Sequence, residues 1–309
     1  MYQEITIQFT EQCNASCPYC FAPIKSYNAL SDVDFNVFHS FCENQSLDVI
    51  HITGGEPSLH PNFGKYINRL ADVGSLVIYS NLLTENMMSD INVKNPSEVV
   101  FLFNTNSENF CYDSDKKNVK KNLEEALLKG IRIALSRTFY EQSIPMEDTF
   151  ASLFDRMQKY KLTHLRLSQA IAFEKSQTGL DRNEIKELYH YVAQNICNWK
   201  KNGWSVYFDC PVPPCYIDNK DFNLLRENKA VSIKCRPKVF VMWNLDVTHC
   251  YSTMREATKK LTSFENICSA KEYSKSILKQ RQEQSNRKGC YQCFHGKDGI
   301  PCACPSYCV

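Results

Sequence analysis

Stretches of strand length alternate with stretches of helical periodicity through the first 205 residues of this 309-residue chain. The predicted strands are 4–9, 48–53, 76–80, 99–104, 131–137 and 164–169. The helices predicted between them are 33–44, 63–73, 118–129, 146–160 and 181–200. Strands that are separated by helices of this length pair in parallel, so the sequence predicts six β/α units of the α/β class. In β/α barrels, ligands gather at the carboxyl ends of the strands.

Three cysteines follow the first predicted strand on one short loop, CNASCPYC, at Cys13, Cys17 and Cys20. Thiolates are the ligands that iron–sulfur clusters use, and this spacing suits three irons of a cubane cluster. A structural zinc ion would want four closed ligands, whereas this trio leaves one metal position open. The alternative is that the three cysteines are buried and only fill space.

The C-x3-C-x2-C loop resembles the signature of the radical S-adenosylmethionine (SAM) superfamily. That resemblance implies a partial (β/α)6 TIM-like barrel in which Cys13, Cys17 and Cys20 bind a 4Fe-4S cluster. It also implies that the amino and carboxylate groups of S-adenosyl-L-methionine chelate the fourth iron, with Tyr19 packing near the adenine.

A second motif, HITGGEP at residues 51–57, resembles the GGEP element of the same superfamily. Gly54 and Gly55 lack a Cβ, so the backbone there can turn sharply and approach a ligand closely. Glu56 can accept a hydrogen bond from an ammonium group, such as the methionyl amine. Taken alone, the element is better explained as a plain turn at the end of a strand, and its position after the cysteine loop favours the resemblance.

Polar residues stand at the ends of the later predicted strands and are candidates to contact the cofactor. The resemblance favours Ser136 and Arg137 after the fifth strand, because relatives use a serine or arginine there. The other candidates are Ser80, Asn81 and Arg166. The alternative for each is ordinary capping of a strand end. No catalytic base or hydrogen donor can be read from the sequence.

The composition limits the classes of partner and chemistry that the chain can have. The net charge of +2 gives no broad basic field, so no nucleic-acid partner is implied. The chain has no apolar run long enough for a membrane span and no secretory signal at its start. Sixteen cysteines in such a chain favour metal chemistry in a reducing cytoplasm over a disulfide framework.

The cysteines crowd into the last third of the chain, which predicts a domain boundary there. Residues 1–205 are predicted to form the barrel, 206–234 a proline-containing linker, and 235–309 a small cysteine-rich α+β domain. Residues 235–250 predict a β-hairpin with Cys235 and Cys250 at its base, and Cys290 and Cys293 form a C-x2-C pair further on. These four cysteines make a complete metal site, for which a zinc ribbon is one reading.

The cysteine-rich segment resembles the SPASM or shorter twitch domain of the same superfamily. That resemblance implies an auxiliary 4Fe-4S cluster on Cys235, Cys250, Cys290 and Cys293. The segment departs from the pattern of that domain in two places. Leu245 stands where a glycine is expected, and the cysteines of the final stretch, CACPSYC, are more closely spaced than usual. The cysteines of that stretch are Cys302, Cys304 and Cys308. They could bind a second auxiliary cluster or replace the Cys290 pair as ligands.

The resemblance implies reductive cleavage of S-adenosylmethionine to a 5′-deoxyadenosyl radical that abstracts a hydrogen atom from the substrate. The leading hypothesis is maturation of a ribosomally made peptide by cross-linking, epimerisation or oxidation. Only twelve residues precede Cys13, so an N-terminal peptide-recognition domain is not expected in this chain, and a separate recognition protein could serve. The alternatives are a dehydrogenase or epimerase of a small metabolite such as an aminocyclitol, and a non-catalytic zinc or iron–sulfur binding module. An enzyme of this kind needs an electron donor such as flavodoxin or ferredoxin.

Overall fold

The computed structural model describes residues 3–20, 26–140, 145–170, 179–211, 216–232, 238–250 and 257–286. The chain divides into two compact units. The first unit contains Met1–Ile133 and Pro237–Leu278, and the second contains Ala134–Arg236 and Lys279–Val309.

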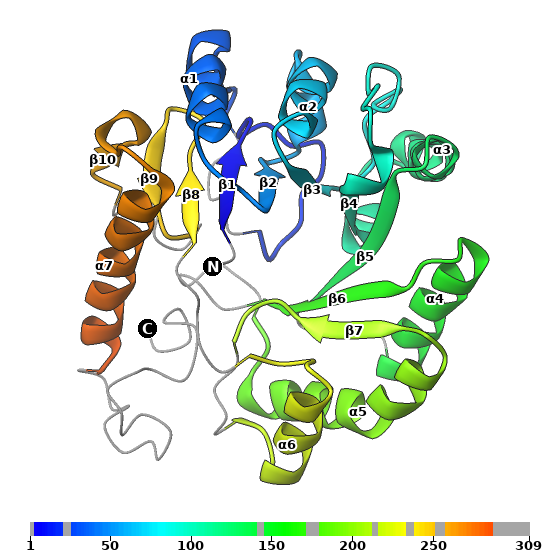
Figure 1. Ribbon diagram of the computed structural model, residues 1–309. Coiled ribbons are helices and arrows are strands. Elements are labelled where there is room, and N and C mark those ends of the chain that lie inside the picture. The colour runs from blue at the N-terminus through cyan, green and yellow to red at the C-terminus, as the bar shows by residue number, and fades with distance from the viewer. Residues whose placement is uncertain are drawn as a thin grey trace. The chain divides into compact units, whose positions relative to one another are not determined.

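The first unit is built on four parallel strands that are adjacent in the order of the sequence (Figure 1). They are β1 (Glu4–Gln8), β2 (Val49–Thr53), β3 (Ser75–Ser80) and β4 (Val99–Asn104). The helices that alternate with them are α1 (Asp32–Glu43), α2 (Phe63–Ala71) and α3 (Asp113–Leu128). Single-turn 3-10 helices follow or precede strands at Pro57–Leu59, Pro96–Glu98 and Thr105–Asn109.

Alternation along the strands sorts the side chains onto two faces. Ile5, Ile7, Ile50 and Ile52 are fully buried, whereas the residues between them are polar. Helices α1 and α2 pack together on one face of β1–β3 (Figure 1), where Phe35 and Tyr66 stack with ring centroids 3.6 Å apart. In β1 and β2, the fully buried side chains are therefore the apolar ones of the alternating pattern.

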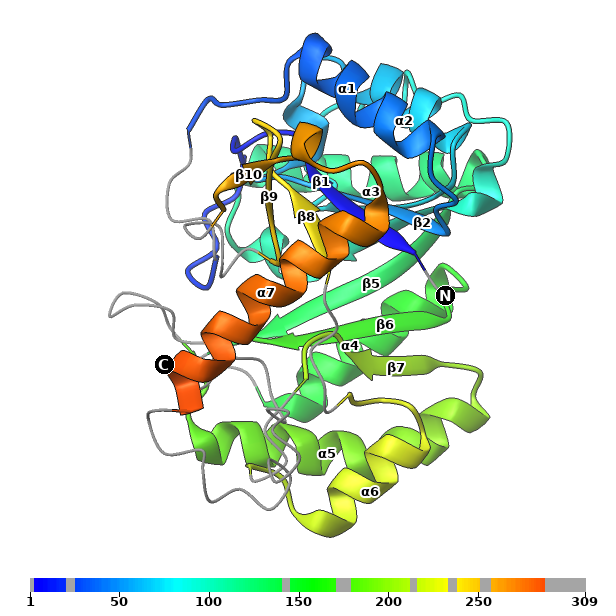
Figure 2. The same cartoon turned by 60° about the vertical axis from the view of Figure 1, so that its left-hand side comes forward.

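A hairpin of β8 (Val239–Val241) and β9 (Asp246–Thr248) continues this sheet, because β8 pairs in parallel with β1. The predicted hairpin is confirmed, and it extends the sheet of the first unit directly (Figure 2). The short strand β10 (Lys259–Lys260) pairs with β9, a 3-10 turn at Leu261–Ser263 follows, and the helix α7 (Ile267–Asn286) completes the described chain. The backbone amide of Ile267 donates to the side-chain oxygen of Gln45 at 3.1 Å.

Leu245, at the turn of this hairpin, has a φ of 65° and is 4% exposed. This is the position at which the resemblance to a SPASM or twitch domain predicts a glycine. The backbone thus keeps the left-handed conformation that favours glycine, although the side chain is a buried leucine.

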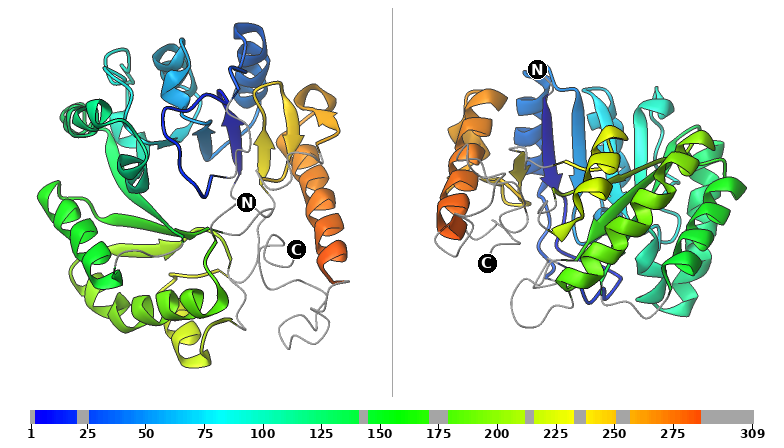
Figure 3. Two further views of the ribbon diagram at one scale, coloured as in Figure 1. Left: turned by 180° about the vertical axis from the view of Figure 1, so that it is seen from behind. Right: turned by 90° about the horizontal axis from the view of Figure 1, so that it is seen from below.

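The second unit holds three parallel strands, β5 (Arg132–Phe139), β6 (His164–Gln169) and β7 (Ser205–Phe208). Its helices are α4 (Met146–Lys159), α5 (Arg182–Lys201) and α6 (Asn219–Glu227), and Figure 3 shows them from two further sides. Aromatic side chains of α4 pack against α5 and against the turn that follows α5. Phe154 stacks on Trp204 with ring centroids 4.3 Å apart.

The structure differs from the predicted linker at 206–234, because β7 and α6 lie in that segment. The prolines that suggested a linker begin only at Pro211, whereas Val206 and Phe208 just before them are buried strand residues. In α6, Phe222 and Leu225 are buried. The division of the chain at residues 205 and 235 remains a prediction.

The predicted α/β class with a parallel sheet is confirmed, and all six predicted strands and five predicted helices are present. The largest error is the start of α3, which begins five residues earlier than predicted. Its first turn is polar and lacks the apolar periodicity on which the prediction rested, but Asp113 and Asp115 suit the positive end of the helix dipole. Within the described residues, none of the helices is long and apolar enough to cross a membrane.

Candidate functional site

The parallel pairing of β1 with β2 continues past the ends of both strands. Gly55 donates its backbone N–H to the carbonyl of Thr10 at 2.7 Å, and Glu56 donates to the carbonyl of Gln12 at 2.7 Å. Gln12 immediately precedes Cys13. The start of the cysteine loop and the GGEP segment are therefore hydrogen-bonded to each other.

The two glycines of the GGEP segment make this pairing possible. A Cβ on Gly55 would lie 2.2 Å from the carbonyl oxygen of Gln12, and a Cβ on Gly54 would lie 2.8 Å from that of Thr10. Neither glycine has a positive φ. In this structure, the close approach that requires glycine is that of the cysteine loop itself, rather than the approach of a ligand on which the prediction was based.

The cysteine loop is irregular and is held at several points. Ser16 donates its backbone N–H to the carbonyl of Phe110 at 2.9 Å, and Cys20 donates to the carbonyl of Cys17 at 3.2 Å. Tyr19 is 8% exposed, packs edge-on against Phe110 and accepts from the Asn104 side chain at 3.5 Å. These contacts attach the loop to the segment after β4.

The thiols of Cys13, Cys17 and Cys20 are half-buried. Among the residues that the structure describes, no three histidine, cysteine, aspartate or glutamate side chains stand together as a site for a single metal ion. A tetrahedral zinc ion needs its ligands around one centre, whereas a cubane cluster distributes its thiolates over separate irons. Three partly accessible thiols on one irregular loop therefore fit a cluster by their donor chemistry.

Glu56 lies three residues after the end of β2, is 1% exposed, and accepts four hydrogen bonds. Its Oε1 accepts from the Ser58 N–H at 3.2 Å, the Ser58 hydroxyl at 2.6 Å and the Ser80 hydroxyl at 2.9 Å. Its Oε2 accepts from the Asn81 N–H at 2.7 Å. Burial raises the pKa of the Glu56 carboxyl, and the four donors oppose that rise.

Ser80 and Asn81, predicted to contact the cofactor, are both buried and both serve this segment. Besides binding Glu56, Ser80 accepts from the Leu82 N–H at 3.0 Å, and the Asn81 side chain donates to the Oδ1 of Asn14 at 2.7 Å. Sequence reasoning missed Asn14 and Thr84, which join this network. Asn14 could have been singled out by its place between two cysteines, whereas nothing in the sequence around Thr84 indicates its role.

The remaining predicted cofactor residues lie in the second unit. Arg166 on β6 pairs with Asp209 and donates to the Ser136 hydroxyl at 3.2 Å. Ser136 and Arg166 are register partners on β5 and β6, whereas Arg137, the next residue on β5, points to the opposite face. The structure thus brings Ser136, Arg166 and Asp209 together and separates Arg137 from them.

Of the predicted auxiliary ligands, Cys250 is half-buried at the end of the hairpin segment. The other predicted ligands lie outside the described residues: Cys235, Cys290, Cys293, Cys302, Cys304 and Cys308. Two cysteines outside the motifs differ in exposure. Cys42 is buried, which raises the pKa of its thiol, whereas Cys197 is exposed on α5.

The sequence model of the Radical SAM superfamily matches residues 7–214. The chain belongs to this superfamily. A curated relative, the S-adenosylmethionine-dependent nucleotide dehydratase of Selenomonas ruminantium, is 22% identical over 184 residues, which are 54% of this chain and 67% of the relative.

Solved structures of the same superfamily share the fold. The peptide-bound and AdoMet-bound anSMEcpe structure matches with a TM-score of 0.66 and 13% identity, over 100% of this chain and 94% of that one. Streptococcus suis SuiB bound to its precursor peptide SuiA matches with a TM-score of 0.65 and 14% identity, over 89% of this chain. This chain covers only 64% of SuiB.

Proposed function

We propose that this protein is a radical SAM enzyme that modifies a ribosomally made peptide. The observation that carries the radical SAM part is the direct pairing of the residues before Cys13 with the GGEP segment. Two short motifs, more than thirty residues apart in the sequence, form one hydrogen-bonded unit at the carboxyl ends of β1 and β2. That edge of a parallel sheet is where β/α proteins bind ligands.

In this proposal, Cys13, Cys17 and Cys20 would hold a 4Fe-4S cluster to which S-adenosylmethionine would bind. Together with an external electron donor, the bound pair would supply reductive cleavage of S-adenosylmethionine and, through it, abstraction of a hydrogen atom from the substrate. The residues of the chain position this chemistry. Glu56 orders the backbone beside the cysteine loop, and Tyr19 closes one side of it against Phe110.

We also propose an auxiliary 4Fe-4S cluster on Cys235, Cys250, Cys290 and Cys293, in a SPASM or twitch-type arrangement. It is supported by the hairpin that ends in Cys250 and by the long helix α7 that leads towards the C-x2-C pair in the sequence. A second auxiliary cluster would draw on Cys302, Cys304 and Cys308. Iron and sulfide are counted in the Cys250→Ala and Cys13→Ala variants. If the auxiliary cluster is separate from the cluster on Cys13, each variant should lose one cluster and keep the other.

One observation supports a peptide as substrate. The fold matches peptide-bound structures of this superfamily, in one case along the whole chain. The alternative, a small metabolite, is favoured by the sequence similarity to a nucleotide dehydratase. Under either reading the enzyme requires an electron donor of the flavodoxin or ferredoxin class, and a peptide substrate could be delivered by a separate recognition protein.

Anaerobic reconstitution tests the proposal. With S-adenosylmethionine and dithionite, the wild-type protein should release 5′-deoxyadenosine, and Cys13→Ala should not. Cys197→Ser is the matched control, because this exposed cysteine lies on α5, outside both motifs, and its replacement should leave the yield unchanged.

Deuterium transfer decides the substrate class. Deuterium from labelled candidate peptides should appear in 5′-deoxyadenosine, whereas transfer only from labelled nucleotides or polyols would reject the peptide hypothesis. No 5′-deoxyadenosine under any condition, with a spectrum unchanged by S-adenosylmethionine, would reject radical SAM chemistry and leave a metal-binding module as the remaining reading.

A further inference from the structure

Five residues around the cysteine loop form a closed circuit of hydrogen bonds through four side chains and through both the side chain and the backbone N–H of Asn81. We call this circuit the polar ring: Glu56, Ser58, Thr84, Asn14 and Asn81. The members come from the loop between Cys13 and Cys17, from the GGEP segment and the residue after it, and from the turn after β3. All five belong to the first unit.

The direction of each bond follows from the donors available. The Ser58 hydroxyl has one proton and lies 2.6 Å from the Glu56 carboxylate, which is the stronger acceptor. The same hydroxyl lies 2.7 Å from the Thr84 hydroxyl oxygen and shares its proton between these two acceptors. The Thr84 oxygen is also the acceptor for the Asn14 amide group at 3.5 Å.

Asn14 closes the circuit with both ends of its carboxamide. Its nitrogen donates to Thr84, and its oxygen accepts from the Asn81 side chain at 2.7 Å. The backbone N–H of Asn81 donates to the Oε2 of Glu56 at 2.7 Å. Glu56 is 1% exposed, so water does not compete for the hydrogen bonds that its carboxylate accepts.

The far side of the ring is fixed by helix α3. The Asn122 side chain donates to the carbonyls of Leu82 and Thr84 at 2.9 Å and 2.7 Å, and the Asn118 side chain donates to the carbonyl of Leu83 at 3.0 Å. These bonds hold a turn in which Leu82 has a φ of 58°. Thr84 therefore presents its hydroxyl from a rigid support.

We propose that the polar ring positions the cysteine loop for cluster binding, with Asn14 as the residue through which it acts. This inference rests on the proposed function, because it concerns the cluster that the three cysteines would hold. Asn14 and Thr84 are positioning residues, and Glu56 is the buried anchor of the ring. The circuit fixes the backbone between Cys13 and Cys17, where the loop has no regular secondary structure.

The test uses Thr84, which lies seventy residues from Asn14 and outside both motifs. Thr84→Val keeps the shape of the side chain and removes its hydroxyl, whereas Thr84→Ser keeps the hydroxyl. Asn14→Ala opens the ring at the loop itself. Asn92→Ala is the control, because Asn92 is an exposed asparagine of the same unit outside the ring.

Two measurements are made on the full-length chain. The first is amide hydrogen exchange of residues 13–20 in the metal-free protein, and the second is the rate at which a chelator removes iron from the reconstituted protein. Each ring-opening variant removes two hydrogen bonds of the ring, and loss of even one neutral bond should speed each process by roughly two- to tenfold. We expect this in Thr84→Val and Asn14→Ala, with Thr84→Ser and Asn92→Ala close to the wild type.

Unchanged exchange in Thr84→Val would overturn the inference, because the ring would then not hold the loop. Faster exchange with unchanged iron release would overturn it as well, because the cluster would then not depend on the ring. If the wild-type protein bound no iron, the proposed function and the role of the ring in cluster binding would both fail. Exchange in Thr84→Val would still decide whether the ring orders the loop.

Discussion

The backbone amide of Gly55 lies 2.7 Å from the carbonyl oxygen of Thr10, to which it donates a hydrogen bond. This bond and its neighbour, from Glu56 to Gln12, join the two motifs that the sequence presents separately. A substitution that moves the backbone of the GGEP segment should therefore also move the backbone of the cysteine loop.

Gly55→Ala should destabilise the protein and impair iron binding together. The new Cβ would lie 2.2 Å from the oxygen and 2.6 Å from the carbon of the Gln12 carbonyl, so the backbone before Cys13 has to move. Overpacking of this kind costs about 1–3 kcal/mol. Urea denaturation and the iron content after reconstitution measure the two effects.

Gly74→Ala is the matched control for this substitution. Its Cβ would meet only the Leu47 oxygen, at 3.4 Å, and the φ of Gly74 is not in the left-handed region. We expect a change in unfolding free energy of about 0.5 kcal/mol or less. Equal behaviour of the two variants would mean that the loop adapts to a side chain at Gly55 without cost.

Glu56→Gln should destabilise the first unit because both oxygens of the carboxylate face donors. The amide nitrogen of glutamine would point its own N–H groups at Ser80 and Ser58 or at the Asn81 N–H. One such mismatch in a buried site costs about 1–3 kcal/mol. Glu85→Gln, an exposed position in the same unit, should leave the urea midpoint unchanged. A midpoint for Glu56→Gln equal to that of Glu85→Gln would show that the site tolerates an amide.

Much of the fold could be predicted from the sequence, because alternation and helical periodicity report which residues are buried. Strand 164–169 and the hairpin around Leu245 were predicted in this way. Strand β7 was not, because it is four residues long and its signal merged with the prolines that follow. Length and turn residues, rather than burial, decided that prediction.

The candidate site was predictable only where its chemistry depends on residue type and local spacing. Cysteines at fixed intervals indicate a metal centre, and two adjacent glycines after a strand indicate a close backbone approach. The contacts of Ser80 and Asn81 with Glu56 were not predictable, because these are ordinary polar residues until the sheet brings them beside it. The same holds for Arg166, whose ion pair with Asp209 joins residues 43 positions apart.

Leu245 allows backbone strain to be separated from side-chain burial. Its left-handed φ of 65° costs roughly 1–2 kcal/mol for a residue with a Cβ, whereas its buried side chain contributes more. Leu245→Gly should therefore be less stable than the wild type but more stable than Leu245→Ala by about 1 kcal/mol. Urea denaturation of the three proteins measures the order. If Leu245→Ala were the more stable variant, the turn would not be strained.

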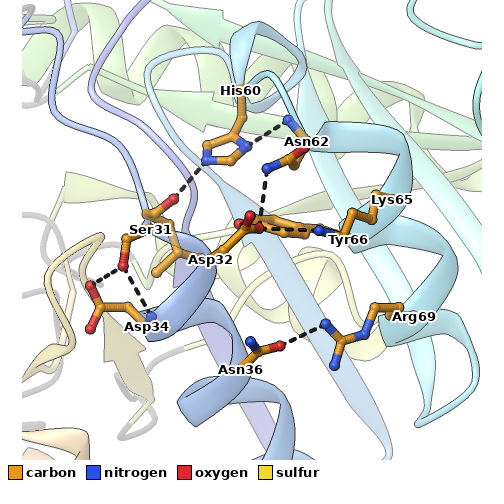
Figure 4. Close-up of polar contacts among 10 residues, drawn as sticks. Ser31, Asp32, Asp34, Asn36, His60, Asn62, Lys65, Tyr66 and Arg69 are labelled. Carbon is orange, nitrogen blue, oxygen red and sulfur yellow. Dashed lines mark hydrogen bonds and ion pairs between the residues drawn. The ribbon is translucent and has the colours of Figure 1, made fainter.

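His60 should make the stability of the protein depend on pH. The ring is 4% exposed, donates from Nε2 to the carbonyl of Leu30 at 2.8 Å, and accepts at Nδ1 from the Asn62 N–H at 3.1 Å (Figure 4). Burial lowers its pKa below the ordinary 6.5, although the Leu30 carbonyl and the nearby Asp32 oppose the shift. A protonated Nδ1 would set two donors against each other at Asn62.

Because the pKa of His60 is lower in the folded than in the unfolded protein, its contribution to stability is fully present above about pH 6.5. That contribution is lost as the pH falls from there through the lowered pKa. His60→Gln, which cannot titrate, should be less stable at about pH 8 but should lose less stability than the wild type on going to about pH 5.5. Urea denaturation at both pH values gives the two differences. If wild type and variant lost stability equally, His60 would not be the group that titrates.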